Sequence, residues 1–567
     1  MNTSNSINIL KKYSNHILMA VLIIIVSLIT YYRVLIQFDM GPLSDSCDFL
    51  SNALVFAGQD MGYSDIIRPP FFSFLLSIIF RMGYVSTNSI FVLDGFIYIF
   101  GVIGMFFLLK TRFSSLQSFL GALLFATFSE VITYVSTGFS DIASVSLTIW
   151  TFYFLILAVK KDSKFFYLTF PFAMLAFLTR YNNALIIFPV FLYILINMSE
   201  IKNIKRVFTG ILTSFLFIIP VLIFFLERFG SILYPFMNFF GTTSTPSLPE
   251  NAAYDANLFF FIEKFPSLIG LGSTLTLLII LSGIFICGFL KFRNSKGERK
   301  LFDGKKLLNE LKTKKRNTKL KLILLIILTL VLVLSFGQIF WMWSEVLFFV
   351  WSYILYDLIK NINIKNKDTH LLFFAWFMVF FIFQSVYTTK DNRYFIEMAP
   401  PVAYFLILGL SEVSNCLKFK IKNKNMTFPI LTLILTVIVL LSTVSYLPVI
   451  EQVNEDNKII NENIISASEW FTNYDPHYKN KVIYSDLWPY FSWYLKTNVK
   501  MMPVFMNGQS YSGGVKDFNL TPQDNLAYNQ ELNNNKADYY FCIRPGLNLT
   551  YYKPVKQFEN VIIYKRV

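Results

Sequence analysis

The sequence predicts a polytopic α-helical membrane protein with about thirteen transmembrane helices, followed by a small α/β domain at the C-terminus. Hydrophobic residues make up 55% of the 567 residues and charged residues only 15%, and the mean hydropathy is +0.52. A soluble domain of this length carries more charge, so that class is excluded. The apolar residues are also gathered into separated runs, and the pattern changes after residue 447.

The first apolar run is uncharged from Ile17 to Tyr32, and Lys11 and Lys12 precede it. No small-residue cleavage site follows, so we expect a retained helix rather than a signal peptide. The runs lie near residues 17–38, 88–109, 116–135, 142–159, 165–179, 182–197, 208–226, 267–290, 321–338, 343–359, 370–387, 396–413 and 428–447.

Basic residues gather in alternate loops between these runs. A cytoplasmic N-terminus places every strong basic cluster on the cytoplasmic side, as the positive-inside bias requires. The clusters are Lys110 and Arg112, Lys160 and Lys161, Lys202 to Arg206, Lys291 to Lys321, Lys360 to Lys367, and Lys418 to Lys424. The densest loop, Lys291–Lys321, is expected to contact the headgroups of anionic membrane lipids. It has few aromatic residues, which argues against nucleic acid as a partner although the net charge is +15.

An odd number of helices places the tail outside the cell. The chain then divides into a transmembrane domain, residues 1–447, and an exterior soluble domain, residues 448–567. A helical stripe around Ile459–Phe471 and the β-type runs "KVIYSD", "ADYYFCI" and "NVIIYK" predict an α/β fold for the tail. The four cysteines are scattered and predict no disulfide framework. Richness in lysine, asparagine and isoleucine is typical of AT-rich prokaryotic genomes, so we expect a multi-pass protein of a prokaryotic plasma membrane.

The first exterior loop, residues 39–87, is acidic although the chain is basic. It carries Asp45 and Asp48 and has no lysine or arginine in its first half. Ser44 is expected to cap a helix over residues 45–57 that lies along the membrane interface. Spacing alone indicates that both carboxylates complement the helix N-terminus and face water.

Several segments follow one another in an order that resembles one superfamily of membrane enzymes. They are "SDSCDFLSNA", "RPPFFSFLLSIIF", "STGFSDIASVSL", "LTRYNNALIIFPV" and "KDNRYFIEMAPPVAYF". Over most of residues 15–415 the chain is similar to the GT-C glycosyltransferases, particularly protein O-mannosyltransferases and lipid A aminoarabinose transferases. The resemblance implies thirteen helices, an exterior C-terminal domain and an active site on the exterior loop 39–87.

The resemblance also implies a catalytic base on the first exterior loop. That position falls best on Asp45, with Asp48 as the alternative. A second carboxylate matches Asp141 in "GFSD", although Asp141 serves equally well as an N-cap of the helix that follows. Asp45, Asp48 and Asp141 could together hold a divalent cation, which leaves a metal cofactor open.

Three arginines and a tyrosine are candidates for binding a donor phosphate. Arg68, Arg180 and Arg393 lie at exterior or membrane-embedded positions although the topology rule favours arginine inside. Arg180 separates two short apolar runs, and it could either act on substrate or snorkel to the interface. Arg393 and Tyr394 precede the twelfth helix, where the resemblance implies contact with phosphate. The alternative for that pair is an interfacial anchor.

The resemblance implies a transferase that moves a sugar from a polyprenyl-phosphate-linked donor to a glycan, lipid or protein acceptor at the exterior face, with inversion and an aspartate as general base. "SDLWPYFSWY" departs from the tryptophan–tryptophan–aspartate motif of oligosaccharyltransferases, which puts transfer to asparagine in doubt. A transporter or flippase of lipid-linked sugars and an inactive GT-C-like subunit are the alternatives. Transporters usually bury charge at the midplane and show internal repeats, whereas here the charges gather at one face.

Overall fold

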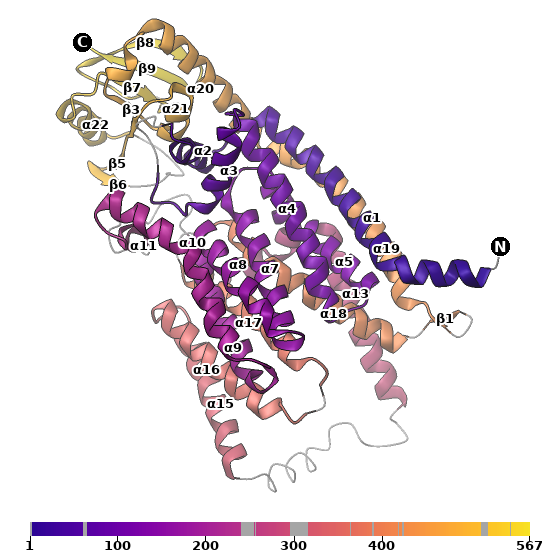
Figure 1. The fold of residues 1–567 in the computed structure, drawn as a ribbon. Coiled ribbons are helices and arrows are strands. Elements are labelled where there is room, and N and C mark those ends of the chain that lie inside the picture. Colours follow the sequence, from indigo (N-terminus) through magenta and orange to yellow (C-terminus); the bar gives the residue numbers. More distant parts are fainter. Residues whose placement is uncertain are drawn as a thin grey trace.

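The computed structural model describes residues 3–59, 65–239, 255, 257–294, 316–362, 364–387, 390–417, 419–421, 424–511, 520–544 and 546–567. Most of this chain is a bundle of helices, and a small α/β domain covers one end of the bundle (Figure 1). The predicted fold class is therefore confirmed.

Ten helical segments in the described part of the chain are long and apolar enough to cross a membrane. They lie on α1 (Thr3–Met40), α4 (Thr87–Lys110), α7 (Ser140–Lys160), α10 (Lys205–Phe229), α12 (Phe260–Glu263) with α13 (Phe265–Asn294), α15 (Arg316–Ser335), α16 (Trp341–Ile359), α17 (Lys367–Val386), η5 (Asn392–Met398) with α18 (Ala399–Leu417), and α19 (Thr427–Val453). The chain is accordingly a multi-pass membrane protein.

The three remaining predicted runs also fold as helices, but shorter ones. They form α5 (Ser115–Ala126) with α6 (Ser129–Tyr134), η1 (Ser163–Phe165) with α8 (Phe166–Thr179), and η2 (Tyr181–Ile186) with α9 (Ile187–Ile196). The run 116–135 is divided because Phe128 has an extended backbone, with ψ 135°. The other short helices are α2 (Ser44–Phe56), α3 (Phe71–Arg81), η3 (Met198–Glu200) and α11 (Tyr234–Phe239).

Helix α7 lies at the centre of the bundle, packed between α4 and α8. Nearly all of its side chains are buried. Helices α10 and α15 instead expose apolar side chains such as Leu216 and Val333, which are 72% and 70% exposed. Such surfaces suit contact with lipid tails.

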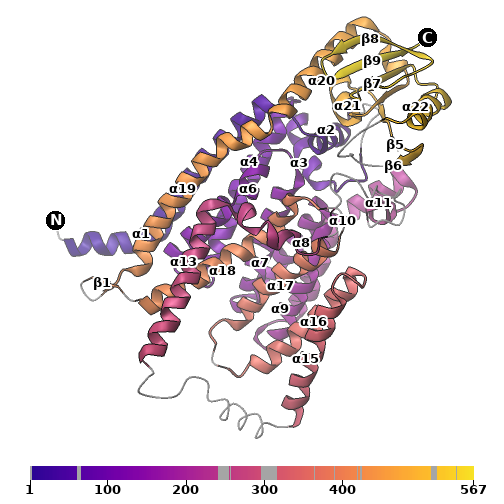
Figure 2. The same ribbon diagram turned by 180° about the vertical axis from the view of Figure 1, so that it is seen from behind.

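Several of the described basic residues pair with acidic residues at the end of the bundle far from the α/β domain. Lys160 lies 2.8 Å from carboxylate oxygens of both Glu200 and Asp368. The hairpin of β1 (Lys420–Ile421) and β2 (Lys424–Asn425) is found at the same end (Figures 1 and 2). Most of the dense basic loop Lys291–Lys321 lies outside the described residues.

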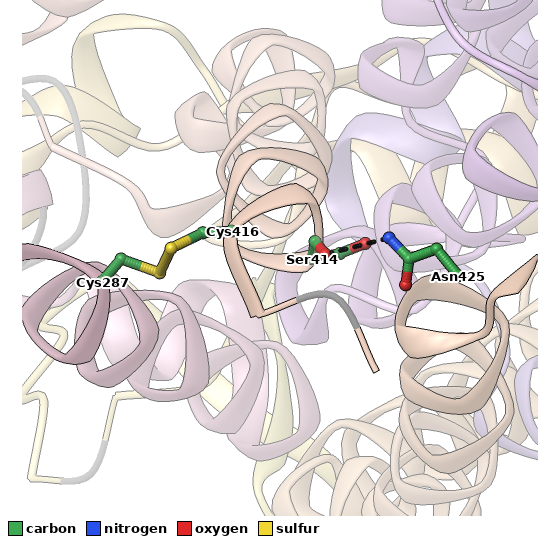
Figure 3. Close-up of a disulfide and its surroundings, with 4 residues drawn as sticks. All are labelled: Cys287, Ser414, Cys416 and Asn425. Atoms are coloured by element: carbon green, nitrogen blue, oxygen red, sulfur yellow. Dashed lines mark hydrogen bonds between the residues drawn. A yellow bond between two sulfur atoms is a disulfide. The ribbon is translucent and has the colours of Figure 1, made fainter. Parts of the chain in front are cut away.

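A disulfide joins two helices that the sequence pattern did not predict to be linked. Cys287 near the end of α13 is bonded to Cys416 near the end of α18 (Figure 3). Beside it, the Asn425 side-chain amide donates a hydrogen bond to the Ser414 carbonyl over 3.3 Å. The other two cysteines, Cys47 and Cys542, are free and buried.

The C-terminal domain contains a five-stranded mixed sheet in the order β4-β3-β7-β9-β8. Its elements are α20 (Glu455–Tyr474), η6 (Tyr478–Asn480), β3 (Ile483–Ser485), α21 (Trp488–Leu495), β4 (Val499–Met501), α22 (Pro522–Asn534), β7 (Tyr539–Cys542), β8 (Tyr552–Phe558) and β9 (Val561–Arg566), with the hairpin β5 (Val504–Met506) and β6 (Gln509–Tyr511) outside the sheet. Strand β3 is parallel to β4 and β7, with Ile483 opposite Val499 and Tyr539. The α/β character predicted for the tail is confirmed.

The α2–α3 hairpin of the first loop shares one hydrophobic core with this domain. Leu50 and Phe72 belong to the same buried cluster as Phe491 and Trp493. The Asn461 side-chain amide of α20 donates hydrogen bonds to the carbonyls of Met40 and Pro42, each at a distance of 3.0 Å. The first loop is therefore held between the bundle and the C-terminal domain.

Candidate active site

A cavity of about 830 Å³ opens beside α2, between the bundle helices and the first loop. Six predicted site residues line it: Asp45, Asp141, Arg68, Arg180, Arg393 and Tyr394. They come from five elements or loops spread over 350 residues of sequence, and the fold brings them to one wall. The seventh, Asp48, does not line the cavity.

Helix α2 presents Asp45 to the cavity from its first turn. The helix begins at Ser44, one residue earlier than predicted, and Leu43 stands at the cap without a side-chain hydrogen bond. The expected Ser44 cap was therefore wrong. Asp45 is paired with two guanidinium groups, Arg68 at 3.0 Å and Arg393 at 2.7 Å, and its side chain is 23% exposed.

Asp48 lies one turn further along α2 and is almost completely buried. Its carboxylate lies 2.7 Å from the Arg68 guanidinium and does not line the cavity. The expectation that Asp48 faces water was wrong, because the C-terminal domain covers this side of α2. Only Asp45 of the two is placed to meet a molecule in the cavity.

Arg68 is the centre of an ion-pair network on the first loop. Besides Asp45 and Asp48 it contacts Asp65, whose carboxylate lies 2.8 Å from Nε. Its guanidinium also lies 5.7 Å from the centre of the Phe49 ring. Such multiple pairing fixes the planar guanidinium in one orientation.

Asp141 and Arg180 form a second ion pair on the cavity wall. Asp141 stands in the first turn of α7, and the cap position is Phe139, so the alternative of an Asp141 N-cap was wrong. Arg180 ends α8 and is 12% exposed, with its guanidinium 5.3 Å from the centre of the Tyr394 ring. Arg180 therefore faces inward rather than snorkelling to an outer surface.

Arg393 is the second cationic partner of Asp45. Its guanidinium pairs with Asp45 and also with Asp391, at 3.2 Å. It lies between aromatic rings, 5.0 Å from the centre of Phe139 and 5.6 Å from that of Tyr394. Contact between a cation and ring faces adds to the ion pairs in holding its position.

The electrostatic environment keeps Asp45 ionised. Burial favours the neutral acid, but the positive charges of Arg68 and Arg393 outweigh burial, so the pKa of Asp45 lies well below its usual range. A carboxylate in this state accepts protons poorly until its cationic partners are engaged elsewhere.

The fold has counterparts among known proteins. Residues 67–224, which include Arg68, Asp141 and Arg180, match the family model for dolichyl-phosphate-mannose-protein mannosyltransferases. By fold, the chain resembles the GT-C glycosyltransferases. ArnT from Cupriavidus metallidurans bound to undecaprenyl phosphate is similar in structure, with a TM-score of 0.55 and 10% identity over 97% of this chain and 98% of that chain.

A second GT-C structure extends the comparison. The archaeal oligosaccharyltransferase AglB from Archaeoglobus fulgidus, in complex with an inhibitory peptide and a dolichol-phosphate, has a TM-score of 0.51 and 12% identity. The match covers 94% of this chain and 70% of AglB. A search of curated protein sequences gives no match.

Several residues at or beside this site were not singled out from the sequence. Asp65 and Asp391 complete the ion-pair network. Glu397, buried in η5, accepts a hydrogen bond from the Ser144 hydroxyl of α7. A glutamate inside the apolar run 396–413 was the signal that could have identified it.

The three aspartates offered for a divalent cation are not gathered into one ligand set. Asp45 and Asp48 pair with Arg68, and Asp141 pairs with Arg180. Among the residues that the structure describes, no group of three or more His, Cys, Asp or Glu side chains lies close enough to hold a metal ion.

Proposed function

We propose that the chain transfers a sugar from a polyprenyl-phosphate-linked donor to a hydroxyl or amine acceptor at the exterior face of the membrane. The observation that supports this most directly is the position of the Asp45 carboxylate, held between Arg68 and Arg393 on the cavity wall. One site then carries both a proton acceptor and groups that bind phosphate, which are the two needs of glycosyl transfer.

The donor phosphate is proposed to bind Arg393 and Arg68, because guanidinium groups match phosphate oxygens in bidentate geometry. These are the groups that hold Asp45 in the structure. Phosphate binding would therefore exchange one anion for another on the same arginines and release the Asp45 carboxylate. Asp45 then becomes a stronger base only when the donor is present.

The released carboxylate is proposed to take the proton of the acceptor as its oxygen or nitrogen attacks the anomeric carbon. The bond from that carbon to the phosphate oxygen breaks, and the electron pair leaves with the polyprenyl phosphate. Attack from the side opposite the phosphate inverts the anomeric configuration. Arg393 and Arg68 stabilise the negative charge on the departing phosphate.

The lipid chain is proposed to follow the apolar wall of the cavity, which includes Phe188, Trp341 and Phe383. The bound undecaprenyl phosphate of ArnT and the dolichol-phosphate of AglB are lipids of this class, which supports the choice of donor. Asp141 and Arg180 occupy the same cavity and are proposed to orient the donor from its other side.

The exterior location is proposed from the charge distribution. The paired basic clusters lie at the end of the bundle opposite the C-terminal domain, and the positive-inside bias assigns that end to the cytoplasm. Residues 1–447 would then form the transmembrane domain, with the active-site loop 39–87 and the domain 448–567 outside. The basic clusters at the cytoplasmic end of the bundle would contact anionic lipids of the plasma membrane.

The test is transfer of radiolabelled sugar by purified protein in liposomes, from undecaprenyl-phosphate-linked sugars and, separately, from nucleotide sugars. We expect transfer only from the lipid-linked donors. Arg393→Ala should raise the donor KM at least tenfold, and Arg393→Lys should rescue only part of it, since lysine loses the bidentate fork. The matched control is Arg206→Ala, which breaks a similar ion pair at the opposite end.

Transfer from a nucleotide sugar without any lipid carrier would contradict the proposal. Movement of a lipid-linked sugar across the liposome membrane without transfer would instead establish the transporter alternative.

A further inference from the structure

Two fully buried ionisable residues inside the bundle do not line the cavity. Arg33 on α1 and Asp94 on α4 are each 0% exposed. Charged side chains within membrane helices are costly and persist where they serve a purpose. Their hydrogen bonds converge on one short segment, residues 132–138, which comprises the end of α6 and the turn that leads to α7.

Arg33 holds the first part of this segment through its backbone. Its Nε donates to the carbonyl of Ile132 and a terminal nitrogen donates to the carbonyl of Thr133, each at a distance of 3.0 Å. The same side chain reaches Gln37 at 3.3 Å, and Gln37 donates to the Gly41 carbonyl at 2.7 Å. Arg33 is thereby linked to the junction that leads into α2.

Asp94 holds the last part of the segment. Its carboxylate accepts a hydrogen bond from the Gly138 backbone N–H over 3.3 Å. The backbone here is in the left-handed region, with φ of +63° at Ser136 and +79° at Gly138. A side chain at Gly138 would be strained and would lie 3.0 Å from Ile90. The turn therefore needs outside support, and Asp94 gives it.

Residues 132–138 and the residues that follow them lie next to Asp45, Arg393 and Asp141 of the candidate site. The Ser46 hydroxyl, next to Asp45 on α2, donates to the Thr137 carbonyl over 2.7 Å. Phe139 follows the turn, and its ring lies under the Arg393 guanidinium. Asp141 comes two residues later on α7. A shift of this backbone would move the base, the phosphate-binding arginine and the second carboxylate relative to one another.

We propose that Arg33 and Asp94 are positioning residues, which fix residues 132–138 and thereby the spacing among Asp45, Arg393 and Asp141. The inference rests on the proposed function of that site. It assigns to both residues an effect on the rate of the chemical step, because misplacement of reacting groups by about 1 Å costs on the order of a hundredfold.

The experiment compares Asp94→Leu, Asp94→Asn and Ser46→Ala with the wild type in the liposome transfer assay. Asp94→Leu removes the acceptor for Gly138, whereas Asp94→Asn keeps an acceptor oxygen and should restore most of the rate. We expect kcat to fall at least tenfold for Asp94→Leu and Ser46→Ala, with the Kd for undecaprenyl phosphate changed less than threefold. The matched control is Glu345→Leu, since Glu345 on α16 is also 0% exposed in the membrane region but does not belong to this network.

A structural readout separates this inference from the proposed function. Cryo-electron microscopy of Asp94→Leu should show the Ser46 to Thr137 hydrogen bond lost and the turn moved. If the wild type transfers no sugar, the proposed function fails, and this structure alone decides whether Asp94 holds the turn. If Asp94→Leu does not fold, Ser46→Ala and Asp94→Asn carry the test. An unchanged kcat in Ser46→Ala, or an unmoved turn in Asp94→Leu, would overturn the inference.

Discussion

The substitution Asp45→Asn should have two effects of opposite sign. It keeps the size of the side chain but removes its charge and its ability to accept a proton. Transfer should therefore fall, while binding of the phosphate group should become tighter. The second effect follows from the structure, because Asp45 occupies the guanidinium groups of Arg68 and Arg393.

The size of each effect can be worked out from the contacts. Loss of a general base costs about 10²–10⁴ in rate, which is about 2.7–5.4 kcal/mol of transition-state stabilisation at 1.36 kcal/mol per tenfold. The side chains of the two ion pairs are 20–30% exposed, and pairs of this kind are worth about 0.5–1 kcal/mol each. Removing both ion pairs should tighten undecaprenyl phosphate binding on the order of tenfold.

The assay measures both quantities on the same purified protein. Single-turnover transfer from a preloaded donor gives the chemical rate, and titration with undecaprenyl phosphate alone gives the Kd. Asp162→Asn is the matched control, because Asp162 pairs with Arg206 at 2.8 Å at the other end of the bundle. Asp48→Asn should lower thermal stability more than transfer, because Asp48 is buried behind Arg68.

Full transfer by Asp45→Asn would refute the assignment of the base. If Asp48→Asn alone abolished single-turnover transfer in folded protein, the role would pass to Asp48. A Kd for undecaprenyl phosphate that stayed the same or rose in Asp45→Asn would refute the exchange of carboxylate and phosphate on the arginines.

Two further predictions concern topology and acid stability. In intact cells, an impermeant thiol reagent should label Gln523→Cys in the C-terminal domain and spare Lys161→Cys at the end of α7; the reverse pattern would place the cavity in the cytoplasm. Because the pKa of Asp45 lies below its usual range, its ion pairs contribute stability above the unfolded-state pKa of about 3.9, and that stability is lost as the pH falls through the folded value. The melting temperature should therefore decrease as the pH is lowered beyond about 4. Asp45→Asn should make this decrease shallower, and an equal decrease in both proteins would contradict the reasoning.

Local patterns in the sequence located the helices and most of the charged residues that line the cavity. Apolar runs of sufficient length predict helices because the membrane imposes one solution on the backbone. Arginines out of place for the topology rule identified Arg68, Arg180 and Arg393, and all three line the cavity.

The pairings could not be read from the chain in the same way. Asp45 and Arg393 are 348 residues apart, and their contact depends on how η5 packs beside the first loop. The choice between Asp45 and Asp48 depends on which side of α2 the C-terminal domain covers, which no helical spacing reveals. Arg33 was overlooked because it lies inside an apolar run, where its partners are backbone carbonyls rather than a recognisable acidic residue.

The core shared by the first loop and the last domain has a consequence for how the protein is made. Synthesis proceeds from the N-terminus, so the α2–α3 hairpin leaves the ribosome hundreds of residues before Phe491 and Trp493, with which it packs. Until the tail has been made and has folded, the helix that carries Asp45 lacks the packing partners that the C-terminal domain supplies. A truncated chain would therefore insert into the membrane without an ordered active site, and catalytic competence would arrive only with the final stretch of translation.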